Sequence, residues 1–489
     1  MKLSRFLVVS VVVASLVTGF VVDRNERPTT VVEAPIASSV PIAQPNGIWF
    51  CPGGSGPGGM AEVGLELINV GSTAATALIT GIRNGSGAEA REAQEIVEVG
   101  ERRLVRLADL VPESAWMGAV VEVQAGELVV EQTYVGEQAV SGDSIGTDRA
   151  PCHSQTSTTW VAASGATRSV EFGEQMILLV LNPFLDDAVL DIVFDADVGV
   201  DSLVGVVVPA RRVIAIDITD EVTIAGRVSA AIDVVAGRVA VSRLQVVQND
   251  SRAGLAVTPA SAGIAAVWFL PVVHRGTRDD AVTVMNPSRT ETAEVDLEIV
   301  ADGDVMFDPV LLTIRPGRAV QVMLADETRL EGVESMSIVA RSLTGLPVAV
   351  MSESSLPLAD GRVTNYSATV GADSAATRWV APLEDDAGGI VIYNPSATGI
   401  ANVTVSAAVD GELSVVADIE IAPLRRAVIA SADFVLVLED VLPDNGAVER
   451  PLAVIESTEP VAVGRELADV SLHAQLVAMI SGAAAVPLD

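Results

Sequence analysis

Lysine is almost missing from this sequence. Of 30 basic residues only Lys2 is a lysine, and they face 64 aspartates and glutamates, for a formal net charge of −34. So acidic a chain repels phosphate backbones, which argues against a nucleic-acid partner. The acidity fits a well-solvated surface, with a preference for cationic partners or divalent ions as the alternative.

Aromatic side chains are scarce as well, at 3% of residues, although 49% of the chain is apolar. The supply of Val, Ile, Leu and Ala excludes global disorder and suits ordinary small cores. Few aromatics remain for a surface that stacks sugar rings. A chain of 489 residues is too long to fold around one compact core, and its length suggests three or four domains.

Histidine is limited to His153, His274 and His473, so a catalytic base is hard to find. The segment 142–146, Gly-Asp-Ser-Ile-Gly, matches a nucleophile elbow around Ser144. An elbow needs a strand before the serine and a helix after it, whereas residues 147–152 look like a linker without helix-forming character. Scattered glutamates offer no matched pair for glycoside hydrolysis. We therefore nominate no catalytic residue, no cofactor and no metal ligand.

The N-terminus carries a targeting signal. Lys2 and Arg5 precede an apolar run at 6–22, and charged residues follow. Basic residues before such a run keep the N-terminus in the cytoplasm. The run predicts a transmembrane signal anchor after a cytoplasmic tip at 1–5, with a cleaved signal peptide as the alternative. Residues 23–47 are rich in proline and predict a semi-rigid stalk, so the bulk of the chain is expected outside the cell membrane.

Internal repetition is the strongest pattern in the chain. A tryptophan opens each of four copies at spacings of 111, 108 and 111 residues, and an apolar strand ending in asparagine follows it. A turn that contains arginine comes next, and a hairpin pattern closes each copy. The openers are Trp49, Trp160, Trp268 and Trp379, and the asparagines are Asn69, Asn182, Asn286 and Asn394.

A period near 108 residues is too long for a solenoid turn and suits a sandwich of about seven strands. Short valine-rich strands and the lack of an amphipathic helix longer than two turns agree with this size. The sequence predicts an all-β chain with four tandem immunoglobulin-like β-sandwich units after the transmembrane helix. Their ranges are 48–150, 151–262, 263–372 and 373–489.

The repeated residues are interpreted as architecture. Proline after the asparagine ends a strand, and asparagine bonds its own following backbone. The tryptophans are expected to plug the end of each core or the junction with the preceding unit. The C-terminal residues 485–488 resemble a truncated fifth opener, which suggests that an opener completes the preceding unit. We expect a bent rod rather than a closed arrangement of the four units.

Two cysteines, Cys51 and Cys152, lie near the first two openers. In an exported chain an even pair predicts a disulfide, which would close a loop of about 100 residues and contribute roughly 4 kcal/mol. Free thiols are the alternative, and a metal site would need more ligands than nearby His153.

Acidic pairs recur in comparable loops at Asp186–Asp187, Asp279–Asp280 and Asp385–Asp386. Calcium wants six to eight oxygens and could stiffen junctions at such pairs. Solvated turns are the simpler interpretation.

The opener Trp49-Phe-Cys-Pro-Gly53, the second cysteine in Ala150-Pro-Cys152 and the Asn-Pro strands resemble an actinobacterial family of uncharacterised, membrane-anchored secreted proteins. The resemblance covers nearly all of residues 40–489 and implies an envelope location with no activity to carry over. Asn69 departs from the pattern because valine follows it.

The function expected from these observations is a non-catalytic cell-envelope protein, a spacer or a scaffold for a protein or glycan partner. A divergent secreted hydrolase of envelope polysaccharide or ester is one alternative, and an array of carbohydrate-binding modules is the other. The sequence gives no oligomeric state.

Overall fold

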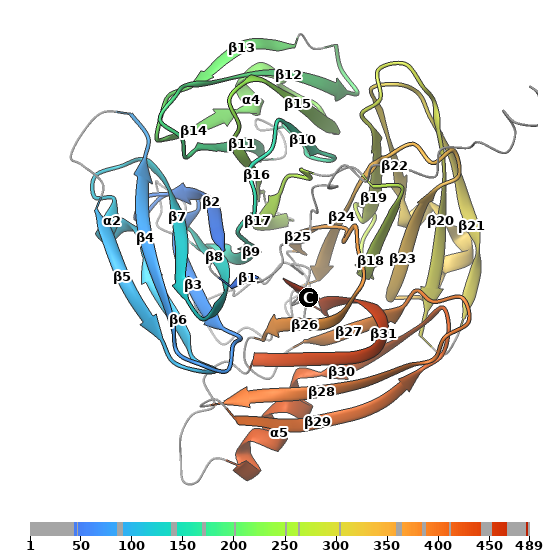
Figure 1. Cartoon of the computed structure of the whole chain (residues 1–489). Helices are drawn as coiled ribbons and strands as arrows, with labels where there is room; N and C mark the ends of the chain where they lie inside the picture. The colour runs from blue at the N-terminus through green and yellow to red at the C-terminus, as the bar shows by residue number, and fades with distance from the viewer. Residues whose placement is uncertain are drawn as a thin grey trace, which may run out of the picture. The chain divides into compact units, whose positions relative to one another are not determined.

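The computed structural model describes residues 44–45, 47–85, 91–137, 144–168, 173–199, 202–249, 252–262, 265–302, 305–357, 364–383, 388–409, 412–441, 452–466 and 486–487. The expected anchor at 6–22 and the stalk up to residue 43 lie outside these residues. Within them the chain is all-β, and its strands form four groups in chain order, coloured from blue to red in Figure 1. We call these groups modules 1 to 4.

The elements of the modules are as follows. Module 1 contains β2 (Ile48–Ser55), β3 (Glu62–Asn69), β4 (Ala75–Arg83), β5 (Glu92–Val97), β6 (Arg102–Arg106), α2 (Leu107–Leu110), β7 (Trp116–Ala125), β8 (Glu127–Glu137) and β9 (Ser144–Pro151), preceded by β1 (Gln44–Pro45). Module 2 contains β10 (Thr159–Ala162), β11 (Glu174–Asn182), β12 (Ala188–Ala196), β13 (Leu203–Val208), β14 (Arg212–Asp217), α4 (Ile218–Glu221), β15 (Val228–Ala236), β16 (Ala240–Gln248) and β17 (Arg252–Pro259). Module 3 contains β18 (Val267–His274), β19 (Ala281–Asn286), β20 (Ala293–Ala301), β21 (Met306–Ile314), β22 (Arg318–Met323), η1 (Leu324–Asp326), η2 (Thr328–Leu330), β23 (Ser335–Ser342), β24 (Ala349–Pro357) and β25 (Thr364–Val370). Module 4 contains β26 (Ala376–Pro382), β27 (Gly389–Asn394), β28 (Ala401–Val409), β29 (Glu412–Ile421), β30 (Arg425–Ala430), α5 (Ser431–Val441), β31 (Leu452–Glu466) and β32 (Val486–Pro487).

Each module is a sandwich of two antiparallel layers, which in module 1 are linked by one parallel pair, Ser55 of β2 with Glu62 of β3. The first, sixth, third and fourth strands form the opener sheet, for example β10-β15-β12-β13. The fifth, second and seventh form the asparagine sheet, and in modules 1 to 3 the eighth pairs with the seventh, as in β14-β11-β16-β17. In module 4 the sixth and seventh strands are one continuous strand, β31, which pairs first with β26 and β28 and then with β27.

This pairing differs from the immunoglobulin arrangement in one respect. In an immunoglobulin domain the seventh strand lies beside the sixth. Here the opener strand takes that place, and the seventh strand pairs with the second, as β16 does with β11.

The eighth strand was not expected from the sequence. Residues 144–151 form β9, which pairs with β8 along its length, whereas the sequence predicts a linker at 147–152. Their side chains lack the alternation of apolar and polar residues that marks a half-buried strand. The helix α5, with 11 residues, is likewise longer than the two turns that the sequence suggested.

The opener belongs to its own module. Strand β10 pairs with β15 of the same module, and Val161 forms a bridge with Ser261, which follows the module's last strand. In module 4 the segment β32 pairs with β26 in the same way. The expectation that an opener completes the preceding unit is therefore wrong.

Successive modules contact one another, and module 4 contacts module 1. Strands β17 and β25 pair in parallel and join the asparagine sheets of modules 2 and 3. Tyr393 packs with Val300 and Val339 between modules 3 and 4. Apolar residues of β26, β28 and β31 share a core with module 1, and Arg465 pairs with Glu131 across the same contact. We call these contacts seams. Because module 4 contacts module 1 within residues 37–489, the expectation of a bent rod is wrong for this part of the chain.

Candidate binding site

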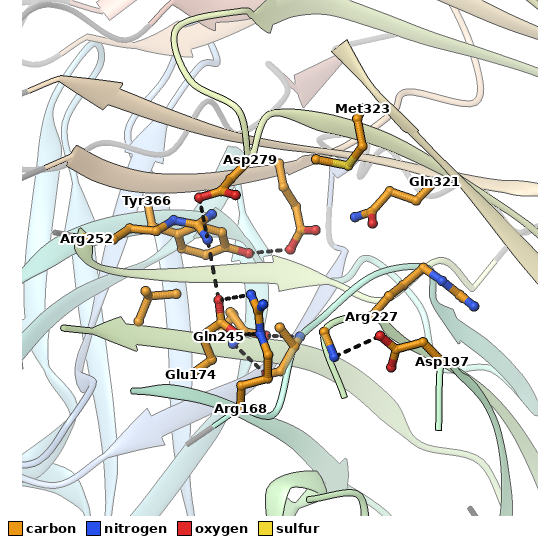
Figure 2. A pocket seen from close by; sticks show the side chains of 14 residues that line it. Arg168, Glu174, Asp197, Arg227, Gln245, Arg252, Asp279, Gln321, Met323 and Tyr366 are labelled. Atoms are coloured by element: carbon orange, nitrogen blue, oxygen red, sulfur yellow. Dashed lines mark hydrogen bonds and ion pairs between the residues drawn. The ribbon is translucent and has the colours of Figure 1, made fainter. Parts of the chain in front are cut away.

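A cavity of about 350 Å³ lies at the seam between modules 2 and 3 (Figure 2). Module 2 contributes residues of the loop before β11 and of β16 and β17, and module 3 contributes residues of β22, β24 and β25. Charged and amide side chains dominate its wall. The lining consists of Ala166, Arg168, Glu174, Asp197, Gly226, Arg227, Gln245, Val247, Arg252, Asp279, Gln321, Met323, Glu353 and Tyr366.

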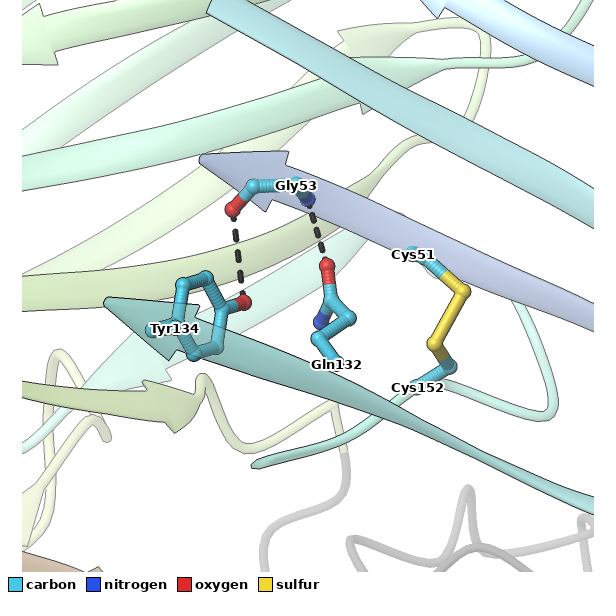
Figure 3. The surroundings of a disulfide bond; sticks show 5 residues. All are labelled: Cys51, Gly53, Gln132, Tyr134 and Cys152. Atoms are coloured by element: carbon cyan, nitrogen blue, oxygen red, sulfur yellow. Dashed lines mark hydrogen bonds between the residues drawn. A yellow bond between two sulfur atoms is a disulfide. The ribbon is translucent and has the colours of Figure 1, made fainter. Parts of the chain in front are cut away.

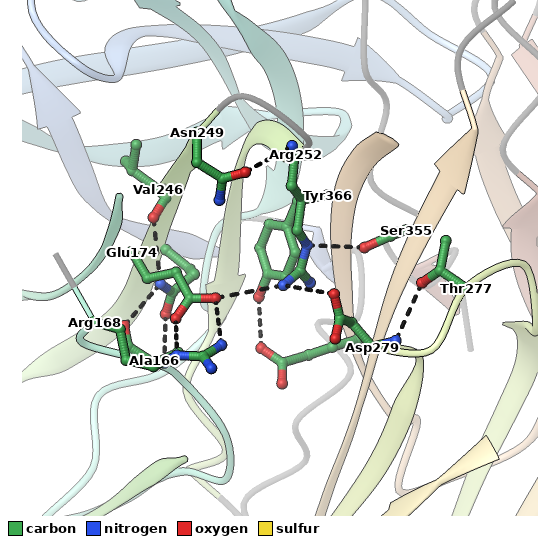
Figure 4. Close-up of polar contacts among 12 residues, drawn as sticks. Ala166, Arg168, Glu174, Val246, Asn249, Arg252, Thr277, Asp279, Ser355 and Tyr366 are labelled. Carbon is green, nitrogen blue, oxygen red and sulfur yellow. Dashed lines mark hydrogen bonds and ion pairs between the residues drawn. The ribbon is translucent and has the colours of Figure 1, made fainter. Parts of the chain in front are cut away.

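One wall of the cavity is an ion-pair chain centred on Glu174 (Figure 4). Arg168 donates from Nε and Nη2 to the two carboxylate oxygens of Glu174, at 2.7 and 2.9 Å. Arg252 lies 3.5 Å from the same carboxylate and 4.8 Å above the ring of Tyr366. The fork-shaped pairing orients Arg168, and its bond to Glu174 raises the pKa of the guanidinium further.

The floor of the cavity is a buried network that joins the two modules. Arg243 on β16 donates to Glu353 Oε1 at 2.8 Å and to the Tyr366 hydroxyl at 2.7 Å. Ser164 donates to the other oxygen of Glu353 at 2.5 Å. Burial alone would raise the pKa of Glu353, but the Arg243 charge and these hydrogen bonds outweigh it and lower the pKa. The carboxylate is therefore ionised at neutral pH, and the seam carries a buried ion pair.

The open side of the cavity carries polar side chains that can form further hydrogen bonds. Asp197 accepts one bond, from the Gly226 amide at 3.2 Å, and Asp279 lies 3.8 Å from Arg252. Gln321 faces them from β22, and its side-chain amide forms no hydrogen bond with the part of the chain that the structure describes. The rim therefore offers both donors and acceptors to a molecule in the cavity.

A second buried network lies at the seam between modules 4 and 1. Glu131 pairs with Arg465 at 2.9 Å, and Glu66 pairs with Arg102 at 2.8 Å and with Arg149. Burial raises the pKa of Glu66, but the Arg149 and Arg102 charges more than offset it and hold the pKa at about 2. Buried Arg–Glu pairs thus join the modules at two of the four seams, between modules 2 and 3 and between modules 4 and 1.

The cysteines form the expected disulfide, with Cys51 and Cys152 both fully buried and their Cα atoms 4.7 Å apart (Figure 3). Beside it, Gly53 donates to Gln132 Oε1 at 2.6 Å and accepts from the Tyr134 hydroxyl at 3.3 Å. Gly53 has a φ of +87°, and a Cβ there would lie 1.7 Å from the Met117 carbonyl oxygen. The bond ties the opener strand of module 1 to the end of its eighth strand.

The four asparagines do more than end a strand. Asn286 accepts a bond from the Ser288 amide and donates to Glu291 O at 2.8 Å and to Ile314 O at 3.0 Å. Ile314 ends the fourth strand, which belongs to the opposite sheet. Each of the other three asparagines makes the same kind of bond between the sheets, as seen for Asn69, Asn182 and Asn394.

The four tryptophans are buried in the cores of their own modules. In three modules the indole N–H donates to a backbone carbonyl at 2.7 to 3.2 Å, between the sixth and seventh strands in modules 2 and 3 and within the continuous β31 in module 4. These tryptophans are Trp160, Trp268 and Trp379. Trp49 is buried in the core of module 1 in the same way.

The residues weighed as catalytic do not come together among the described residues. Ser144 is the first residue of β9 and not the apex of a strand–helix turn. Burial lowers the pKa of His153 and of His274 to about 4, so both are neutral at pH 7. His473 and the Gly142–Asp143 part of the motif lie outside the described residues.

One carboxylate in each of two acidic pairs accepts hydrogen bonds from backbone amides. The buried carboxylate of Asp280 accepts from the amides of Gly276, Thr277 and Ser355 at 2.5 to 2.6 Å. Asp187 accepts from the Ala210 amide at 2.8 Å, while Asp385–Asp386 lie outside the described residues. In the described ranges no group of three or more His, Cys, Asp or Glu side chains is placed to hold a metal ion.

The charged seam residues were missed by the sequence analysis. Arg243 and Glu353 are 110 positions apart, so no local pattern connects them. The available signal was a charge within an otherwise apolar strand, as in Val241-Ser-Arg243-Leu, because such a charge is rarely buried without a partner.

No protein-family model matches the sequence, and no curated protein matches it significantly. In the described part of the chain no helix is both long and apolar enough to cross a membrane.

Proposed function

We propose that this protein is a non-catalytic, membrane-anchored scaffold of the cell envelope, which holds four sandwich units of immunoglobulin-like size outside the membrane for a protein or glycan partner. One observation carries the proposal: the residues that recur in every module serve the architecture. The asparagines fasten the two sheets to each other, and the tryptophans fill the cores.

The disulfide supports the extracytoplasmic location. Disulfides persist mainly in oxidising compartments, and both cysteines of this chain take part in one bond. The resemblance to an actinobacterial family of anchored secreted proteins points to the same compartment and stays a prediction.

The rarity of lysine gives a direct test of topology. Replacing Arg106, whose side chain is 75% exposed, by lysine creates one amine on module 1 in a chain whose only other lysine is Lys2. An amine reagent that cannot cross membranes should label the Arg106→Lys protein on intact cells and leave the unmodified protein unlabelled. Labelling of the variant only after lysis would refute the location.

Crosslinking from the same lysine tests the scaffold role. A short amine-reactive crosslinker applied to cells with the Arg106→Lys protein should capture an envelope component, and the unmodified chain is the control. Hydrolytic turnover of envelope esters or polysaccharides by the purified protein, lost in Ser144→Ala, would show that it is an enzyme instead.

A further inference from the structure

We propose that the cavity between modules 2 and 3 binds an uncharged, polyhydroxylated ligand, a mono- or disaccharide. The inference gives the proposed scaffold a ligand class and rests on that proposal only for its biological setting. It is carried by the cavity's size, by the balance of charge on its wall and by the unused hydrogen-bonding groups at its rim.

The size and shape suit a small molecule. Ligand pockets commonly measure about 300–1,000 Å³, and this cavity measures about 350 Å³. Its walls are held in place from both sides, by the Arg168–Glu174 pair in module 2 and by the Glu353–Tyr366 bond in module 3. Side chains fixed in this way lose little conformational freedom when a ligand arrives.

The charge balance selects against an ionic ligand. Three arginines and four carboxylates line the cavity. An anion seated near Arg168 or Arg252 would lie close to Glu174 and Asp279, because these carboxylates pair with the same arginines. A cation bound by the carboxylates would face the arginines. A neutral molecule meets neither repulsion.

Hydroxyl groups match the groups at the rim. A hydroxyl donates one hydrogen bond and accepts others, so a polyol can donate to the carboxylates of Asp197 and Asp279 and accept from the Gln321 amide and from Arg227. Met323 adds an apolar contact beside Gln321 (Figure 2). The face of Tyr366 is covered by Arg252, so recognition would depend on hydrogen bonds and not on stacking of a sugar ring on an aromatic face.

The experiment is saturation-transfer NMR and calorimetry on the full chain with N-acetylglucosamine, galactose and trehalose as probes, beside inorganic phosphate, calcium and methylamine. At least one sugar should bind, and the three ions should not compete with it. Gln321→Ala removes a hydrogen-bonding group at the rim, and Asp197→Asn replaces a charged acceptor by a neutral amide. Each should weaken sugar binding by about tenfold.

A matched control is Gln94→Ala. Gln94 is an exposed glutamine in module 1, bonded to Gln124 and remote from the cavity in sequence and module. Its loss should leave sugar binding unchanged. The proposal is overturned if none of the sugars binds, if phosphate, calcium or methylamine binds in their place, or if Gln94→Ala weakens binding as much as Gln321→Ala. The cell-labelling test is independent, so either result can fail without the other.

Discussion

At the scale of single residues, a side chain here matters when it satisfies backbone groups that the sandwich would otherwise bury unpaired. The asparagine at the end of each second strand is the clearest case. Its side-chain amide donates hydrogen bonds to a carbonyl in a loop and to a carbonyl at the end of a strand in the other sheet. A buried carbonyl without a hydrogen-bond donor lowers the free energy of unfolding. The asparagine therefore stabilises both the loop and the packing of the two sheets.

Replacing Asn286 by alanine is expected to destabilise the protein by about 3 kcal/mol, because it leaves the buried carbonyl of Ile314 and its neighbours without donors. The measurement is urea unfolding, combined with hydrogen exchange to locate the loss in β19 and β21. Asn402→Ala, at an exposed asparagine in module 4, is the control and should change stability by less than about 0.5 kcal/mol. Similar losses in both variants would contradict the role given to Asn286.

The ionisation of Glu66 predicts acid sensitivity. Its pKa falls from 4.5 in the unfolded chain to about 2 in the folded protein, so the carboxylate stabilises the fold above pH 4.5. This contribution, on the order of 3 kcal/mol, is lost as the pH drops from 4.5 toward 2. Glu66→Gln should be less stable at pH 7 and should show a flatter stability profile between pH 4.5 and 2. A variant with the unaltered protein's pH profile would show that Glu66 is not the group responsible.

At the scale of elements, the turn before the fifth strand adopts the same backbone conformation with different residues in modules 2, 3 and 4. Arg211 and Leu424 have φ values of 51° and 58°, and Gly317 has 65° at the matching place in module 3. The left-handed region costs an L-residue roughly 1–2 kcal/mol, and glycine avoids that cost. The exposed arginine of module 2 is therefore strained where the glycine of module 3 is not.

Arg211→Gly should stabilise the protein by up to about 1 kcal/mol, since relief of strain exceeds the extra entropy of glycine in the unfolded chain. Gly317→Ala should destabilise it by about as much. A Cβ at Gly317 meets no atom within 4 Å, so the effect would report φ alone. Thermal unfolding of the two variants is the measurement, and shifts of the same sign would contradict the assignment.

The disulfide closes module 1 as an element. Replacing both cysteines by alanine should lower stability by about 4 kcal/mol in the chain-entropy model, because 101 residues separate Cys51 from Cys152. Hydrogen exchange should rise first in β2 and β9. Reductant under denaturing conditions should bring the unaltered protein to the stability of the double variant and leave that variant unchanged.

At the scale of the whole described unit, the four seams differ in whether a buried Arg–Glu pair joins the modules. Between modules 1 and 2 and between modules 3 and 4, apolar side chains pack together, and the buried side chains of Asp148 and Arg426 add polar contacts. Buried Arg–Glu pairs join modules 2 and 3, and modules 4 and 1. A buried ion pair is costly to break from one side, because the remaining charge stays desolvated.

Glu131→Ala should therefore loosen the seam between modules 4 and 1 by about 3–5 kcal/mol, as Arg465 would lose its buried partner. Limited proteolysis should then release module 4 faster than in the unaltered protein. Asp109→Ala breaks an exposed pair with Arg106 and should leave the cleavage rate unchanged. If both variants are cleaved alike, the buried pair does not hold the seam.

The sequence predicted the repeated fold because tryptophan and asparagine recur at matched positions and because the strands are short and rich in valine. The disulfide was predictable from two cysteines in a chain that looks exported. The eighth strand was not, because Asp148 and Arg149 interrupt its apolar pattern; both are buried in β9, and Asp148 accepts from the Val257 amide across the seam to module 2. The cavity was not predictable either, since its residues come from segments about 100 positions apart and no local period joins them.

The contact between modules 4 and 1 also bears on the insertion or removal of a copy among the described repeats. An open row of repeats can gain or lose a copy by gene duplication or deletion, since each unit needs only the neighbour before it. Here Arg465 of the last copy already occupies the place opposite Glu131 of the first. A fifth copy would have to part that pair, and the removal of one copy would leave two seams without their counterparts. The stability of each described copy therefore depends on both of its neighbours, including the pair formed between the first copy and the last.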